Sequence, residues 1–128
     1  MELGDTTSEA LLVVNHWLEA LATGDPDKVV AMYDADSCVL VPTFGTSALR
    51  GREAIRGYFV DFIANHPGLH GMVHEEVNQN LGGGRRSISG HYTFRWDDGG
   101  IQEARFTFVV VEAAGVWDIH THHSSVMP

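Results

Sequence analysis

The sequence predicts an α+β domain in which helices cover one face of a curved antiparallel sheet. Two observations carry this prediction. Before residue 68, apolar residues recur mainly at helical spacing, and from residue 69 to the end most of them alternate with polar residues, as in strands. Helices that precede a run of antiparallel strands favour packing of all the helices against the sheet.

The first predicted helix follows Ser8, which is a plausible N-cap, and ends at Thr23-Gly24. Its apolar stripe contains Leu11, Val14, Trp17, Leu18 and Leu21. A second, short helix begins after Asp25, because Pro26 at the first helical position has no N–H to leave unpaired.

A strand over "SCVLVP" and a loop over "TFGTSALRG" lead into the third predicted helix, "REAIRGYFVDFIANH", which ends at Pro67-Gly68. Four strands follow: "LHGMVHEEVNQNL", "RSISGHYTFRW", "IQEARFTFVVVE" and "VWDIHTHHSS". The segments between them, "GGG", "DDGG" and "AAG", are typical hairpin turns.

Length and composition limit the function classes. A chain of 128 residues is the size of one domain, so we expect residues 1–128 to form a single unit. A net charge of −9 without a basic cluster argues against nucleic acid. No apolar run is long enough to span a membrane and no export signal is evident, so we expect a cytoplasmic protein. The single cysteine, Cys38, is expected to be a core residue.

Counting residue pairs outward from the predicted turns indicates which residues lie on each face of the sheet. If Ala114-Gly115 is a two-residue turn, Phe106 lies opposite His123 and Phe108 opposite Thr121. His123 and Thr121 would then share the face under the helices, while His120 and His122 would lie on the outer face.

The same arithmetic through "DDGG" places His91 and Arg95 under the helices. It places Tyr92 and Phe94 on the outer face, and this much aromatic surface predicts contact with a second subunit. A shift of one residue in either turn would exchange the two faces.

His123 is the candidate catalytic residue, because an imidazole in a partly apolar cavity suits acid–base chemistry; the alternative is a satisfied polar residue at the pocket floor. Candidate ligand-binding residues are Trp17, Tyr58, Phe59, His91, Tyr92, Arg95, Arg105 and Thr121. Core packing explains Trp17 and Phe59 equally well, and an interface contact explains Arg105. Asp118, His120 and His122 form an Asp-x-His-x-His pattern, but a metal site is not expected on an interface face.

Several segments together resemble the nuclear transport factor 2-like superfamily. They are "LEALATGDPDKVVAMYDADSCVLVP", "RGREAIRGYF", "HYTF", "ARFTFVVVEAAGVW" and "HTHHSSVMP". Within the superfamily the chain is most similar to small bacterial proteins akin to the calcium/calmodulin-dependent kinase II association domain. The resemblance implies a cone-shaped α+β barrel with a pocket between helices and sheet, and dimers formed through the sheet.

The resemblance does not select one function, because this superfamily contains isomerases, cyclases, dehydratases and non-catalytic hubs. In the ketosteroid isomerases the catalytic base is an aspartate that would correspond to a position near Val41, which cannot take a proton. Two functions stay open. One is binding of a small hydrophobic, neutral or acidic molecule, with or without acid–base chemistry and without a cofactor or metal. The other is a non-catalytic dimerisation or assembly module.

Overall fold

A computed structural model describes the backbone of residues 3–128 and the side chains from Leu12 onward. The element order is α1 (Leu3–Ala22), α2 (Pro26–Val30), β1 (Val39–Val41), β2 (Leu49–Arg50), α3 (Arg52–Ala64), β3 (His70–Gly82), β4 (Arg85–Arg95), β5 (Ile101–Ala113) and β6 (Val116–Val126). Among these residues, no helix is both long and apolar enough to span a membrane.

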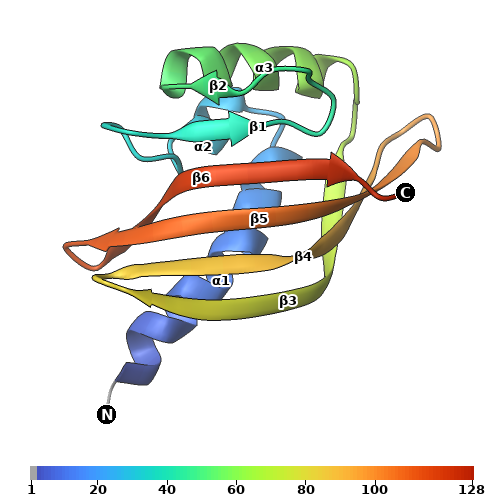
Figure 1. Cartoon of the computed structure of the whole chain (residues 1–128). Helices are drawn as coiled ribbons and strands as arrows, with labels where there is room; N and C mark the ends of the chain where they lie inside the picture. Colours follow the sequence, from blue (N-terminus) through green and yellow to red (C-terminus); the bar gives the residue numbers. More distant parts are fainter. Residues whose placement is uncertain (1–2) are drawn as a thin grey trace.

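The helices lie on one side of the sheet (Figure 1). Helix α1 crosses behind the long strands, and α3 lies beside β1 and β2. The structure starts α1 at Leu3, so the predicted N-cap at Ser8 is wrong. The start of α2 is as predicted: the Asp27 amide donates to the Asp25 carboxylate over 2.9 Å, and Pro26 follows at the first helical position.

The sheet is mixed, with strand order β2-β1-β6-β5-β4-β3. Strand β1 pairs in parallel with β6, and all other neighbours are antiparallel. The α+β prediction and the three hairpins are confirmed. The predicted loop after β1 also contains the two-residue strand β2.

A bulge in β3 bends the sheet at one position where the facing strand must carry glycine. Residues Val73 and Glu75 pair with Tyr92 and His91, so His74 is the extra residue. A Cβ atom on Gly90 would lie 1.7 Å from the carbonyl oxygen of Glu75. Any larger residue at Gly90 would therefore force the two strands apart and flatten this part of the sheet.

A second bulge corrects the predicted register of β5 and β6. Val110 pairs with Ile119 as expected, but the next pairs are Val109 with Thr121 and Phe108 with His122, so His120 is the extra residue. All later residues of β6 exchange faces relative to the prediction. His122 faces the helices, and His123 lies on the outer face opposite Thr107.

The predicted register of β4 and β5 is also wrong by one residue. Tyr92 pairs with Ala104 and His91 with Arg105, because the hairpin pairs Arg95, not Trp96, with Ile101. Tyr92 and its neighbour on the same face, Phe94, are consequently buried under the helices. The aromatic surface that predicted a subunit interface is therefore part of the core.

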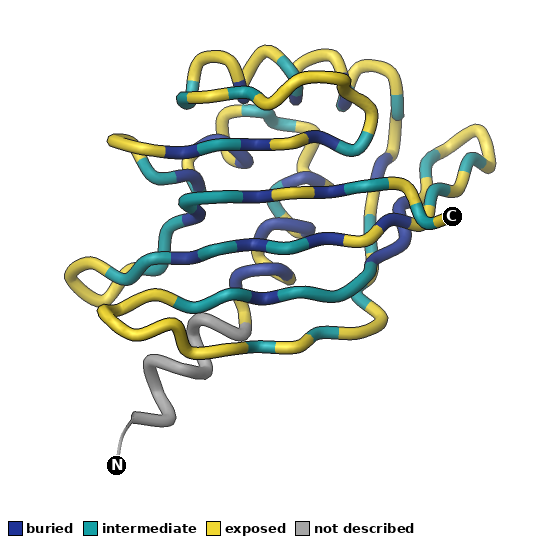
Figure 2. The backbone as a smooth tube through the Cα atoms, in the orientation of Figure 1, coloured by how far each residue is buried: buried dark blue, intermediate teal, exposed yellow. Residues whose placement is uncertain are grey.

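The core lies between α1, α3 and the central strands, and buried segments gather there (Figure 2). Trp17 is its largest member and contacts the rings of Phe59, Tyr92, Phe94 and Phe108. Cys38 is buried, as predicted. Its pKa is raised because burial disfavours the thiolate.

Candidate functional site

His122 lies at the centre of the core rather than on the surface. Its side chain is 1% exposed, and its ring stacks on Phe108 of the neighbouring strand with ring centres 3.9 Å apart. The Trp17 ring system is nearly perpendicular to the imidazole, with ring centres 4.9 Å apart. Aromatic walls on two sides therefore fix the orientation of this imidazole.

Tyr33 approaches His122 from the segment that follows α2. The backbone of this segment pairs with β6, since the amide of Ile119 donates to Met32 and that of Asp34 donates to Ile119, each over 2.8 Å. The Arg52 guanidinium donates two hydrogen bonds to the Tyr33 carbonyl. This anchoring places the Tyr33 hydroxyl 2.8 Å from Nδ1 of His122.

Tyr92 and Ser124 continue the polar contacts on the other side of the imidazole. The Tyr92 hydroxyl lies 3.2 Å from Nε2 of His122 and donates to Oγ of Ser124 over 2.8 Å. Ser124 in turn shares a short hydrogen bond with Thr43, which follows β1. The indole N–H of Trp17 donates to the Tyr33 hydroxyl over 3.2 Å at the far end.

These contacts form one chain with a definite direction. The Tyr92 hydroxyl donates its one proton to Ser124, so its oxygen accepts a hydrogen bond from Nε2–H of His122. Nδ1 of His122 then accepts from Tyr33, whose oxygen accepts from the indole of Trp17. The other tautomer would leave the Tyr33 proton without an acceptor among the described residues. The network therefore selects the neutral Nε2–H form of His122.

Burial also keeps the members of this network uncharged. Burial, assisted by the neighbouring His123, lowers the pKa of His122 to about 3. Burial raises the pKa of both Tyr33 and Tyr92. At neutral pH the chain thus consists of a neutral imidazole and neutral hydroxyl groups, which suits directional hydrogen bonding better than proton abstraction.

A pocket reaches this network from the side of α3 and the loop after β1. Its lining is mostly aromatic and carries no charged side chain: Trp17, Leu40, Pro42, Thr43, Tyr58, Phe59, Phe62, Phe94, His122 and Ser124. The empty space is about 210 Å³, part of it open to solvent. The space that a water-sized sphere can occupy is only about 10 Å³, so the pocket as it stands holds about one water molecule and a larger ligand must displace side chains to enter.

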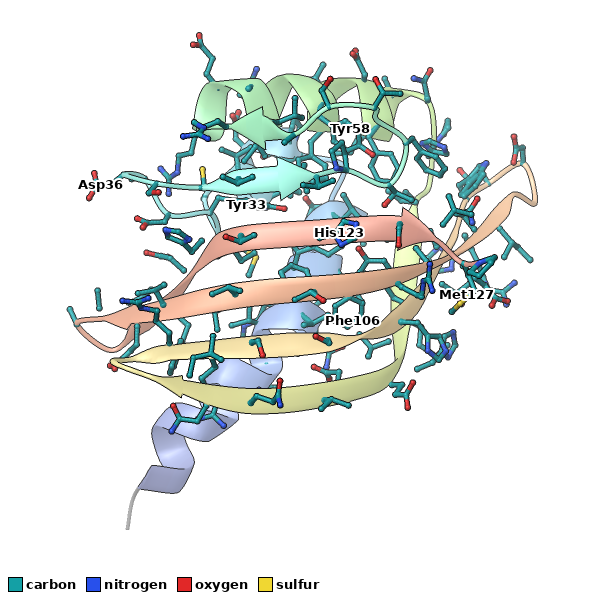
Figure 3. The ribbon with its side chains drawn as sticks, in the orientation of Figure 1. Tyr33, Asp36, Tyr58, Phe106, His123 and Met127 are labelled. Carbon is teal, nitrogen blue, oxygen red and sulfur yellow. The ribbon has the colours of Figure 1, made fainter. Side chains whose placement is uncertain are left out.

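Tyr58 reaches from α3 toward β1 (Figure 3). Its hydroxyl accepts a long, 3.4 Å hydrogen bond from the amide of Phe44, in the loop that carries Thr43. Burial raises the pKa of Tyr58 to about 12, so this phenol is neutral at physiological pH. The Phe44 ring, 45% exposed, stacks on His66 and meets Phe62. The loop after β1 therefore closes over one side of the pocket.

Of the predicted ligand-binding residues, Trp17, Tyr58 and Phe59 line this pocket. Tyr92 does not line the pocket itself, but its hydroxyl donates a hydrogen bond to Ser124, which does. The other predicted positions are elsewhere: His91, Arg95 and Arg105 lie on the outer face, and Thr121 lies next to the bulge. His123 is exposed on that outer face, so its predicted position under the helices is wrong, although His123 itself is on β6 as expected (Figure 3).

Sequence reasoning missed four polar members of the site. His122 and Ser124 were placed on the wrong face, because no residue type marks the bulge at His120. Tyr33 and Thr43 belong to segments without regular periodicity. The one available signal for Tyr33 was an aromatic residue directly after the apolar positions of α2, in "VVAMYD".

The outer face of the sheet has a different character. Histidines and arginines lie among hydroxyl side chains and valines, and Ser89 and Thr107 share a hydrogen bond at its centre over 3.1 Å. His91 lies 3.5 Å from the carboxylate of Glu75. No cluster of three metal-ligating side chains occurs within residues 12–128.

Comparison with solved structures shows the same fold in several bacterial proteins. A protein from Xanthomonas campestris, provisionally described as a calcium/calmodulin dependent protein kinase II association domain, is 35% identical with a TM-score of 0.85, over 94% of this chain and 86% of that chain. A provisional dehydratase of the nuclear transport factor 2-like family from Streptomyces avermitilis is 17% identical with a TM-score of 0.83, over 97% of each chain. A provisional scytalone dehydratase from Novosphingobium aromaticivorans is 13% identical with a TM-score of 0.78, over 98% of this chain and 84% of that chain.

The sequence comparisons agree with the structural ones. The family model for the calcium/calmodulin dependent protein kinase II association domain matches residues 6–128. The search of curated proteins gave no match. Together with the fold, these findings confirm the resemblance to nuclear transport factor 2-like proteins that the sequence motifs indicated.

Proposed function

The chain belongs to the calcium/calmodulin dependent protein kinase II association domain family, and on that premise we propose that it binds a small, uncharged, largely hydrophobic molecule in the pocket beside His122. The observation that carries this proposal is the buried chain of hydrogen bonds that ends, at Ser124 and Thr43, on the wall of an aromatic pocket. Hydrophobic walls with a few fixed polar groups are the usual composition of a ligand site.

The charge of the pocket favours a neutral ligand over an acidic one. Arg95 and Arg105, the arginines suggested for a carboxylate, are exposed and do not line the pocket. An anion in this pocket would lose its hydration without gaining a cationic partner, which costs several kcal/mol.

The network supports binding more strongly than catalysis. A histidine with a pKa of about 3 is a weak base at neutral pH, and both of its nitrogens already have hydrogen-bond partners. Acid–base chemistry on the bound molecule is therefore the weaker part of the proposal. It would require the ligand to exchange protons with His122 through Ser124 and Tyr92.

NMR of the tryptophan indole N–H groups tests the binding proposal. Toluene is the neutral probe and benzoate the anionic one. We expect toluene to shift the resonance of Trp17, which lines the pocket, and to leave that of Trp117 unchanged. Benzoate should shift neither. A Trp17 resonance that responds to neither compound, up to the solubility of toluene, would contradict the proposal.

The second candidate function is a non-catalytic assembly module, and the family match is the observation that favours it. In this version two copies of the chain associate through the outer sheet face. Its central residues Ser89, Thr107 and Val109 are only half-buried in the single chain, so a partner could cover them further. The pocket would then have no required ligand.

Sedimentation velocity tests the assembly candidate. We expect a dimer whose dissociation constant increases strongly in Thr107→Glu, because the new carboxylate would be buried at the interface without a partner. Val60→Glu, at an exposed position of α3, is the matched control and should remain dimeric. A monomeric wild-type protein at micromolar concentration would contradict this candidate.

A further inference from the structure

We propose that the ligand of the pocket is a small neutral carbonyl compound, such as a one-ring aryl ketone, whose oxygen replaces the Thr43 hydroxyl as the hydrogen-bond partner of Ser124. This inference rests on the proposed binding function and adds the chemical class of the ligand. It follows from the direction of the hydrogen-bond chain rather than from the shape of the pocket.

Ser124 presents a donor to the pocket. Its oxygen already accepts from Tyr92, and Tyr92 cannot reverse because it accepts from Nε2–H of His122. The proton of Ser124 is therefore not used within the chain. Among the described side chains, the Thr43 hydroxyl is the one group that can accept it. A ligand that takes up this proton in place of Thr43 must supply an acceptor.

Tyr58 presents a second donor to the same pocket. Its oxygen accepts from the amide of Phe44, and no side chain or carbonyl of residues 12–128 accepts its own proton. The phenol is neutral, so this proton is available to a ligand. Tyr58 and Ser124 line the same pocket, and their two protons suit the two lone pairs of one carbonyl oxygen.

In the structure the Thr43 hydroxyl occupies the position at Ser124 that the ligand oxygen would take. It lies in the loop after β1, whose other attachments near the pocket are weak or exposed: a 3.4 Å hydrogen bond to Tyr58 and the partly exposed ring of Phe44. Without movement the pocket has room for about one water molecule. Entry of an aryl ketone therefore requires Thr43 and this loop to move outward.

Acetophenone and α-methylstyrene test the inference because they have nearly the same shape and differ in C=O against C=CH₂. Binding is measured by the shift of the Trp17 indole resonance. We expect the wild-type protein to bind acetophenone on the order of 10-fold more tightly, the ratio given by about 1.4 kcal/mol of hydrogen bonding. In Ser124→Ala the preference should fall to about threefold or less, with α-methylstyrene affinity unchanged.

Thr43→Val is the second variant, because it removes the competing hydroxyl and keeps the side-chain shape. It should bind acetophenone several-fold more tightly than the wild-type protein, with the gain for α-methylstyrene smaller. Equal wild-type affinity for the two compounds would overturn the carbonyl inference and leave the binding function in place. Absence of binding by both would overturn the two proposals together.

Discussion

His122 and His123 are consecutive histidines on one strand, and their environments have almost nothing in common. His122 is enclosed by Trp17 and Phe108, with a hydrogen-bond partner for each ring nitrogen. His123 is exposed on the outer face, opposite Thr107. The comparison shows that the chemistry of each histidine is set by the face it occupies, and a single extra residue, His120, decides that face.

The largest expected difference between the two faces is in stability. His122→Ala should lower the free energy of unfolding by about 3 kcal/mol, because it leaves a cavity beside Phe108 and removes hydrogen-bond partners from Tyr33 and Tyr92. His123→Ala, the matched control, should change it by no more than about 0.5 kcal/mol. Urea denaturation measures both, and similar losses in the two variants would refute the face assignment.

Deletion of single residues tests the bulge itself. Deleting Ile119 would bring the side chain of Asp118 or His120 into the core position of Ile119, at a cost of at least about 2 kcal/mol. Deleting His120 removes only the extra residue, and the pairs on either side can keep their partners. We therefore expect the His120 deletion to be clearly more stable in thermal or urea unfolding. The reverse order would show that β6 is regular.

A smaller effect, per unit of pH, is expected in the pH dependence of the free energy of unfolding. The unfolded chain protonates His122 near pH 6.5, whereas burial lowers its pKa to about 3 in the folded state. Between these values only the unfolded chain carries the proton. The stabilising contribution of neutral His122 is thus complete above pH 6.5 and declines by about 1.4 kcal/mol per pH unit toward pH 3.

Unfolding of two variants from pH 7 to pH 4 isolates this contribution. His122→Gln should lose the part of the pH slope that one bound proton contributes, while Val60→Ala, which removes no titratable group, should keep the wild-type slope. Other groups titrate in both variants, so the difference between the slopes is the measured quantity. Identical slopes would show that His122 is accessible to protons in the folded protein.

The smallest expected effect is at Arg105, on the outer face. Arg105→Ala should change the free energy of unfolding by no more than about 0.5 kcal/mol and should leave the response of the Trp17 resonance to toluene unchanged. The control is Phe59→Ala, inside the pocket, where binding should change. A loss of toluene binding in Arg105→Ala would mean that the two faces are not separate.

Much of the fold could be predicted, because it depends on repeated local patterns. The helical spacing through Trp17 and Leu21, the Asp25–Pro26 start of α2 and the three hairpins each have a signal in the sequence, and each is present in the structure. Three pocket residues, Trp17, Tyr58 and Phe59, were found for the same reason, since they lie on the apolar stripes of their helices.

The polar part of the site could not be predicted in the same way. Side chains alternate along a strand, so an error of one residue in pairing exchanges every later side chain between the two faces. The turn residues Ala114-Gly115 were identified correctly, and the pairing that they imply holds as far as Val110 and Ile119. Beyond that pair the extra residue made His122 a core residue and left His123 outside.

The sequence by itself determined the element order, the apolar stripes and the presence of histidines and hydroxyl residues near the end of the last strand. Only the tertiary structure decided which histidine is buried and joined it to Tyr33, which lies 89 positions earlier in the chain. The physical reason is that helical and hairpin patterns arise from neighbours in sequence, whereas a bulge is selected by packing across the sheet. The bulge at His120 keeps Ile119, His122 and Ser124 on the face under the helices, and no local residue preference encodes that choice.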